Sequence, residues 1–242
     1  MREVVGSDGT MVVLSPAMTV TPELEARLKE LCTIFLEENS KLNLSAFRTE
    51  ETCWNGNILD SVAALGCPLF ERKNLRVLDV GTGGGFPLLP LAICMPDSHF
   101  VGVDSTQKKI DAIKRIIDRM NLTNVELICG RTEELGHDKV HREQYDIVTA
   151  RAVAELNTLL EFTSPFAKVK GHVVAWKSTT IDEELQNSLL ARAEFSCHLT
   201  EKFRYTLPGD WGQRQLLLFE KSFALKRQYP REVGTPKKDP II

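Results

Sequence analysis

The chain has 242 residues, of which 43% are hydrophobic and 26% charged, and its formal net charge is −3. This composition is ordinary for a globular protein, and the length allows a sizeable core in one large domain or two small ones. The net charge alone does not indicate a nucleic-acid-binding protein.

The six cysteines are scattered singly, without a CxxC pair or a close histidine partner. They predict a reducing compartment and neither a disulfide framework nor a metal site. The N-terminal MREVVGSDGT segment carries acidic residues early, unlike a signal or transit peptide. The longest uncharged apolar run, around 88–96, is too short and too proline-broken to span a bilayer. We therefore expect a cytoplasmic, monomeric protein with no metal and no membrane attachment.

Residues 1–20 show no clear periodicity and predict a loose N-terminal arm. A helix is indicated from Thr21, which suits the N-cap and is followed by proline at the first helical position. A second helix is expected over 49–65, weakened by Gly56 in its middle. Together they predict a helical cap over 21–72, packed on or beside a sheet. The first helix carries an apolar stripe at helical spacing, formed by Leu24, Leu28, Leu31 and Phe35.

The stretch 75–105 predicts a strand, a glycine turn, a helix and a second strand, in that order. The apolar run over 75–80 is long enough for a buried strand and too short for a helix. A helix is expected near Pro87, and a strand over 99–103 delivers Asp104 about twenty residues after the turn, where open parallel sheets place the acid that binds a ribose diol. The unit therefore predicts an adenosine-containing cofactor. The turn between strand and helix lets a ligand approach the backbone closely at its glycines, Gly81, Gly83, Gly84 and Gly85.

The glycine spacing distinguishes between two such cofactors. A dinucleotide-binding turn has the pattern GxGxxG, but here the last position is Phe86 or Leu88, depending on the glycine from which it is counted. The strand end instead looks like the first motif of the S-adenosylmethionine methyltransferases, here formed by Asp79, Gly81, Gly83 and Gly85. This likeness implies S-adenosylmethionine as the cofactor; a nicotinamide-dependent oxidoreductase is the alternative, and it would need the third glycine.

The rest of the chain alternates between strands and helices. This alternation predicts an α/β fold with a doubly wound, mostly parallel sheet and right-handed crossovers. The last two strands have no helix between them, so one of them should run antiparallel. The expected helices are 107–120, 156–166 and 181–193, and the expected strands are 125–129, 145–150, 172–176, 196–205 and 215–220.

Positive charge gathers at two places in this acidic chain. From Lys221 onward the net charge is +4, which predicts a basic C-terminal tail over 223–242. A second basic cluster lies on the helix 107–120 and consists of Lys108, Lys109, Lys114, Arg115 and Arg119. Basic patches on an acidic protein suit local binding of a structured polyanion, although a solvent-exposed helix face explains the second cluster equally well.

Several short motifs occur in a specific order from about residue 39 to the C-terminus. They are NLSA (43–46), ILDS (58–61), VLDVGTGGGFP (77–87), LPLA (89–92), VDS (103–105), RTEE (131–134), RAVAEL (151–156) and YPREVGTPKKDPI (229–241). On these motifs the chain resembles the bacterial small-subunit ribosomal RNA guanine-N7 methyltransferases, also called the glucose-inhibited division protein B family.

The resemblance implies a seven-stranded methyltransferase domain over 73–222, S-adenosylmethionine as methyl donor, and a guanine in the 530 loop of 16S ribosomal RNA as acceptor. It also implies that Arg151 lies between cofactor and target, and that Lys177 ends the fifth strand. The implied cofactor contacts are Gly81 and Phe86 at the methionine, Asp104 at the ribose, and Thr132 and Glu133 at the adenine.

The chain departs from the family pattern at four positions. Family members usually show Arg-His before the ILDS motif, where this chain has Gly56 and Asn57, and glycine where this chain has Leu88 and Ser178.

The chemistry of guanine N7 explains why no acid–base dyad is evident. N7 carries an unprotonated lone pair at neutral pH, so alignment and desolvation of the reactants suffice. Methylation at pyrimidine C5 would need a Pro-Cys pair, and exocyclic-amine methylation an Asn/Asp-Pro-Pro-aromatic turn; residues 150–153 read Ala-Arg-Ala-Val instead. We expect Arg151 to orient the substrate through guanine O6 or a phosphate, unless it only pairs with Glu133 or Asp146. Lys177 is a candidate phosphate contact or a solvated strand end.

Two tryptophans, Trp176 and Trp211, are candidates for stacking on a flipped base, with a core or lid role as the alternative. The expected partner is 16S ribosomal RNA or the small ribosomal subunit. A methyltransferase for another RNA, a protein or a small molecule stays open, as does a ribosome-assembly binder without activity.

Overall fold

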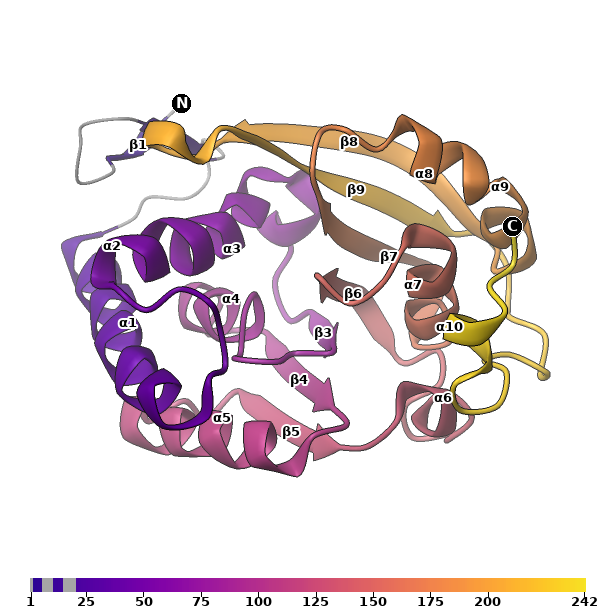
Figure 1. Ribbon diagram of the computed structural model, residues 1–242, viewed down its shortest axis with the longest axis horizontal. Coiled ribbons are helices and arrows are strands. Elements are labelled where there is room, and N and C mark those ends of the chain that lie inside the picture. The colour runs from indigo at the N-terminus through magenta and orange to yellow at the C-terminus, as the bar shows by residue number, and fades with distance from the viewer. Residues whose placement is uncertain (1, 6–10, 15–20) are drawn as a thin grey trace.

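The computed structural model describes residues 2–5, 11–14 and 21–242, and its centre is a seven-stranded sheet (Figure 1). The strand order is β5-β4-β3-β6-β7-β9-β8. Six of these strands run in the same direction, and β9 runs opposite to them. The predicted doubly wound, mostly parallel, seven-stranded α/β fold is thus confirmed. The strands are β3 (Arg76–Val80), β4 (His99–Asp104), β5 (Val125–Cys129), β6 (Tyr145–Arg151), β7 (Ala167–Lys177), β8 (Cys197–Thr206) and β9 (Gln213–Lys221).

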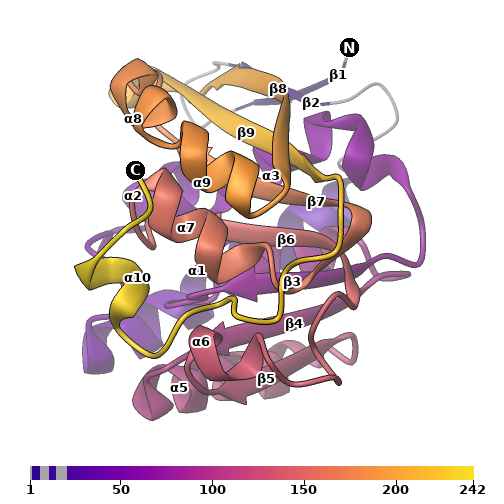
Figure 2. The same cartoon turned by 90° about the vertical axis from the view of Figure 1, so that its right-hand side faces the viewer.

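Helices cover both faces of the sheet, and each face has its own apolar core (Figures 1 and 2). Alternate residues of β3 supply both cores, Val77 on the face of the N-terminal cap and Leu78 on the other. Parallel strands buried on both faces read as continuous apolar runs, which is why the strands could be predicted. The first face carries α1 (Pro22–Leu42), α4 (Leu88–Cys94) and α5 (Gln107–Met120). The second carries α7 (Leu156–Thr163), α8 (Asp182–Asn187) and α9 (Leu189–Glu194).

Helix α1 begins as predicted, with the Thr21 hydroxyl accepting a hydrogen bond from the Leu24 amide at 3.2 Å. Asn39, which could have ended the helix, lies within it. The buried Asn39 side chain fixes the loop that follows the helix, because its amide donates to the carbonyls of Ser45 and Phe47 and its oxygen accepts from the Ser45 amide. The helix therefore runs on to Leu42.

The second predicted helix is helical throughout but changes type along its length. It starts as α2 (Glu50–Cys53), continues as a π-helix, η1 (Trp54–Leu59), and ends as α3 (Asp60–Val62) and the 3₁₀ turn η2 (Ala63–Gly66). A further 3₁₀ turn, η3 (Pro68–Glu71), leads to the sheet. Single π-helical turns are uncommon and occur frequently at functional sites.

The structure describes the C-terminal end of the chain throughout and the N-terminal end only in part. Within the expected N-terminal arm, β1 (Arg2–Val5) pairs antiparallel with β2 (Met11–Leu14), and the rest of the arm lies outside the described residues. The C-terminal segment lies against the second face and includes α10 (Thr235–Lys238), beside α7 and α6 (Thr132–Leu135) in Figures 1 and 2. In the described part of the chain, no helix combines the length and apolar character needed to cross a bilayer.

Candidate functional site

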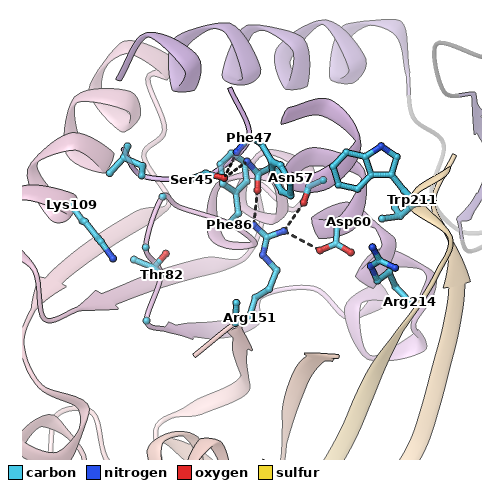
Figure 3. A pocket seen from close by; sticks show the side chains of 17 residues that line it. Ser45, Phe47, Asn57, Asp60, Thr82, Phe86, Lys109, Arg151, Trp211 and Arg214 are labelled. Atoms are coloured by element: carbon cyan, nitrogen blue, oxygen red, sulfur yellow. Dashed lines mark hydrogen bonds and ion pairs between the residues drawn. The ribbon is translucent and has the colours of Figure 1, made fainter. Parts of the chain in front are cut away.

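Two adjoining cavities open at the carboxyl ends of the central parallel strands, where open α/β sheets bind their ligands. The Arg151 cavity has a volume of about 430 Å³ and lies between the end of β6, the N-terminal cap and the β8–β9 loop (Figure 3). The Asp104 cavity has a volume of about 270 Å³ and lies between the ends of β3, β4 and β5 and the C-terminal segment. Gly81, Lys109 and Ala152 border both cavities, so a ligand in one can reach into the other.

The glycine turn after β3 is held against the end of β4. The Thr82 amide donates to the Val103 carbonyl at 2.9 Å, and the Gly83 amide donates to Asp104 Oδ2 at 3.0 Å. Gly81 and Gly83 have φ values of +68° and +58°, in the left-handed region that favours glycine. The turn therefore exposes backbone to both cavities while its geometry is fixed by β4.

Asp104 is 7% exposed and borders the same cavity as Gly81. Its Oδ1 accepts from the Thr106 amide at 2.9 Å, and Lys109 Nζ lies 3.9 Å from Oδ2. These donors orient the carboxylate, yet each oxygen has a second lone pair for a ligand hydroxyl. An adenosine-binding unit requires that the glycine turn and the acid border one cavity, and Gly81 and Asp104 meet this requirement.

Thr132 and Glu133 lie at the start of α6 and border the Asp104 cavity. The Thr132 hydroxyl donates to Glu133 Oε2 at 3.2 Å. The other carboxylate oxygen, Oε1, accepts from the Gly234 amide at 3.0 Å, so the C-terminal segment reaches this side of the cavity.

Arg151 ends β6 and borders the Arg151 cavity, with its guanidinium fixed by the η1–α3 segment (Figure 3). Nη1 donates to the Gly56 carbonyl and to Asp60 Oδ2, both at 3.0 Å, and Nη2 donates to Asn57 Oδ1 at 2.8 Å. The guanidinium carbon lies 5.7 Å from the centre of the Phe86 ring, which borders the same cavity. Arg151 thus pairs with Asp60 and with neither Glu133 nor Asp146, the two partners that the sequence offered as the alternative to a substrate-orienting role.

Asp60 is itself tied into the sheet. Its Oδ1 accepts from the Tyr205 hydroxyl at 2.6 Å, and its carbonyl accepts from Trp176 Nε1 at 2.9 Å. Burial and the neighbouring Asp60 carboxylate raise the pKa of Tyr205, so this hydroxyl stays protonated and remains a donor. Trp176 is therefore a buried positioning group and not a stacking surface.

Two aromatic side chains, Phe47 and Trp211, border the Arg151 cavity on the side away from the glycine turn. Their ring centroids lie 5.1 Å apart at an interplanar angle of 71°. A Cβ at Gly56 would come within 2.5 Å of Phe47 and 2.6 Å of Trp211. The glycine at this position therefore makes room for the aromatic pair.

Three predicted site residues border neither cavity. Asp79 is 1% exposed, and its Oδ1 accepts from the Thr149 hydroxyl at 2.7 Å; burial raises the pKa of Asp79 to about 6. Gly85 packs against Leu89, whose Cδ1 would lie 2.7 Å from an added Cβ. The Lys177 ammonium donates to the Ala154 carbonyl and to Glu184, so its side chain is engaged within the protein.

The sequence analysis assigned no role to several residues that border the Arg151 cavity, among them Phe47, Asn57, Asp60 and Arg214. Asp60 was noted only as part of the ILDS motif and Asn57 only as a departure from the family pattern. No local signal shows that either residue contacts Arg151, more than ninety positions away.

The fold is that of the class I S-adenosylmethionine-dependent methyltransferases. A solved putative O-methyltransferase from Klebsiella pneumoniae is similar in fold, with a TM-score of 0.54 and 16% identity over 80% of this chain and 90% of that one. A solved SAM-dependent methyltransferase from Aquifex aeolicus gives a TM-score of 0.53 and 16% identity over 76% and 97% of the two chains.

A family model described as rRNA small subunit methyltransferase G matches residues 24–215, and the chain belongs to this family, GidB. A protein of that name from Alkaliphilus metalliredigens is 38% identical over 208 residues, which cover 86% of this chain and 87% of that one. Another, from Streptococcus agalactiae serotype III, is 33% identical over 231 residues, which cover 95% and 97%. The resemblance inferred from the motifs is thus confirmed.

Fold and family together make S-adenosylmethionine the cofactor of this protein. The residues present fit it. Asp104 offers carboxylate lone pairs beside the backbone of Gly81, and a Cβ at Gly83 would meet no protein atom but the Gly81 carbonyl oxygen, 3.7 Å away. This open space beside the turn suits a ligand that approaches the backbone.

Proposed function

We propose that this protein methylates N7 of a guanine in the 530 loop of 16S ribosomal RNA, with S-adenosylmethionine as donor. The adenosine lies in the Asp104 cavity, with Asp104 at the ribose and Thr132 and Glu133 at the adenine. The methionine passes Gly81 and Phe86, and the cofactor's sulfonium methyl is presented to the Arg151 cavity. A ribosomal RNA substrate also places the protein in the cytoplasm.

The observation that carries this proposal is the state of the polar groups around the Arg151 cavity. Of its described lining residues, the only carboxylate is Asp60, and both its oxygens are engaged, by Arg151 and Tyr205. No histidine or cysteine is among them. The described lining of the cavity therefore offers no thiol nucleophile and no unpaired carboxylate as a general base. It suits an acceptor atom that is already nucleophilic, as guanine N7 is at neutral pH.

In this arrangement the protein accelerates the reaction by alignment. The Asp60 and Asn57 side chains and the Gly56 carbonyl use three of the five guanidinium N–H groups of Arg151, which leaves two for the acceptor. A donor near guanine O6 or a phosphate orients the base without competing for the methyl group. The remaining rate acceleration comes from bringing the reacting atoms to contact distance and excluding water.

The outer part of the Arg151 cavity supports a nucleotide as acceptor. The Phe47–Trp211 pair offers aromatic surface on which a splayed base can stack. Arg214 borders the same cavity and donates a hydrogen bond to the carbonyl of the preceding residue; no ion pair with it occurs among residues 21–242. A cation beside aromatic rings, with no acidic partner in that part of the chain, suits a base with its phosphate.

The test is transfer of a methyl-tritiated cofactor to small ribosomal subunits and to naked 16S RNA, with the modified position mapped as 7-methylguanosine. We expect ribonuclease-sensitive label in the 530 loop, and loss of that modification in cells without the gene. Ribonuclease-resistant label would indicate a protein or small-molecule acceptor. Binding to subunits with no transfer would indicate an assembly factor without activity. Either result would refute the proposal.

A further inference from the structure

The C-terminal segment 231–239 lies outside the part of the chain that the family model matches, which ends at residue 215. It belongs to the tail that starts at Lys221, whose net charge of +4 suggested binding to a polyanion. In the structure, however, most of the tail's cations are engaged within the protein. Lys221 is fully buried on Glu143, Lys226 pairs with Glu194 at 2.6 Å, Arg231 pairs with Glu161 at 2.7 Å, and Lys237 lies 5.8 Å from the centre of the Phe162 ring.

The anchor of this segment is the ion pair between Arg231 and Glu161. Glu161 lies on α7 and is 1% exposed, and its two oxygens accept from Nε, Nη2 and the backbone amide of Arg231. A buried carboxylate without its partner is strongly destabilising, so this pair holds the segment against α7. A second link is the hydrogen bond from the Thr158 hydroxyl to the Pro236 carbonyl, at 2.9 Å.

The anchored segment then reaches the Asp104 cavity. Gly234 and Lys237 border it, as do Thr132 and Glu133. Gly234 has a φ of +85°, and its amide donates to Glu133 Oε1 at 3.0 Å. Because that oxygen accepts a hydrogen bond from the C-terminal segment, the orientation of Glu133 toward the cavity depends on a residue 101 positions later in the chain.

We propose that the C-terminal segment 231–239 is part of the cofactor-binding site: it closes the adenosine side of the Asp104 cavity, and Gly234 positions Glu133 for the adenine. This inference rests on the placement of the adenosine given under Proposed function. It predicts that cofactor binding and docking of the segment stabilise each other, since a ligand that binds only the docked form shifts the equilibrium toward it.

The experiment uses S-adenosylhomocysteine, whose binding needs no acceptor, measured by calorimetry. The first variant is a chain that ends at Pro230 and carries Glu161→Gln, which removes the charge that truncation would strand. The second is full-length Gly234→Pro, which lacks the donor amide and cannot adopt a positive φ. The matched control is Arg227→Ala, an exposed cation of the tail that precedes this segment and does not border the cavity. We expect affinity to fall at least tenfold in both variants and to stay unchanged in the control.

A second measurement is independent of the variants' folding. In the wild-type protein, hydrogen exchange of the peptide containing Gly234 should slow at least tenfold at saturating S-adenosylhomocysteine, because the ligand favours the docked segment. Wild-type affinity in a cooperatively melting truncated chain, or exchange at Gly234 that the ligand does not alter, would overturn the inference while leaving the proposed function intact. A wild-type protein that binds no S-adenosylhomocysteine would overturn both.

Discussion

Arg151 Nη1 lies 3.0 Å from Asp60 Oδ2, and this ion pair joins the end of β6 to the helical segment that precedes the sheet. Both side chains are largely buried, at 17% and 12% exposure, and both border the Arg151 cavity. The pair therefore couples the position of the N-terminal cap to the carboxyl end of the sheet, where the proposed function places the methyl group. Its integrity should matter more for transfer than for cofactor binding.

Asp60→Asn and Arg151→Lys should each lower kcat for methyl transfer by about 10 to 100-fold, because small errors in alignment are costly and lysine lacks the planar fork. Affinity for S-adenosylhomocysteine, measured by calorimetry, should stay within about threefold, because the proposed ribose and adenine contacts lie in the Asp104 cavity, away from Arg151 and Asp60. The control is Asp146→Asn, which breaks the Asp146–Lys168 pair at the opposite end of β6. Equal losses in the control would show that the effect is only structural.

Asp104→Ala should weaken binding of S-adenosylhomocysteine by about 100-fold, since each hydrogen bond to a charged group contributes about 1.5–3 kcal/mol. Calorimetry measures this directly. Asp111→Ala removes an exposed acid on α5 that borders neither cavity, and should bind like wild type. Unchanged affinity in the Asp104 variant would refute its assignment to the ribose.

Gly56→Ala should lower kcat/KM for RNA by about tenfold, because the new Cβ would collide with the Phe47 and Trp211 rings and displace them. Cofactor affinity should not change. Trp211→Ala should produce a comparable loss, and the double variant should lose little more, because both changes disrupt the same surface. Fully additive losses would show that Gly56 acts independently of the aromatic pair.

Arg214→Ala should raise KM for RNA by about tenfold and reduce its dependence on salt, as expected for loss of one phosphate contact. The matched control is Arg204→Ala, which removes an exposed arginine of β8 that borders neither cavity. Kinetics at two salt concentrations make the comparison. If both variants raise KM equally, general positive charge and not Arg214 attracts the RNA.

Asp79 gives a pH-dependent prediction. Its pKa rises from 3.8 to about 6 on folding, chiefly through burial, so the folded state binds more protons than the unfolded state between these values. The free energy of unfolding therefore falls as the pH rises from about 4 to 6. Well above pH 6, the ionised Asp79 lowers it by about 3 kcal/mol. Asp79→Asn keeps an acceptor for the Thr149 hydroxyl and stays neutral.

Thermal melts of Asp79→Asn and wild type at pH 4 and pH 8 test this. The variant should be more stable than wild type at pH 8, with a smaller difference at pH 4. A variant less stable at pH 8 would mean that the ionised carboxylate is favourable in the folded protein.

Much of the sheet was predictable because its signals are local. The limits of α5 and β5 agree with the prediction at both ends, and the glycine turn, β4 and Asp104 lie within one βαβ unit. Such units have a fixed hand and a fixed ligand-binding edge, so spacing alone predicted that Gly81 and Asp104 share a cavity. Lys177 shows the limit of the same reasoning: a strand end indicated the right edge of the sheet but not which side chains reach the ligand.

The sequence by itself determined the fold class, the family and the spacing that brings Gly81 and Asp104 to one cavity, since hydrophobic period, glycine placement and short spacings act within a few tens of residues. Only the tertiary structure decided which groups surround Arg151 and where the C-terminal segment lies. There Asp60 meets Arg151 across 91 positions, and Gly234 meets Glu133 across 101. Contacts of that length form because burying apolar faces brings distant elements together, and no local pattern records which polar groups then meet.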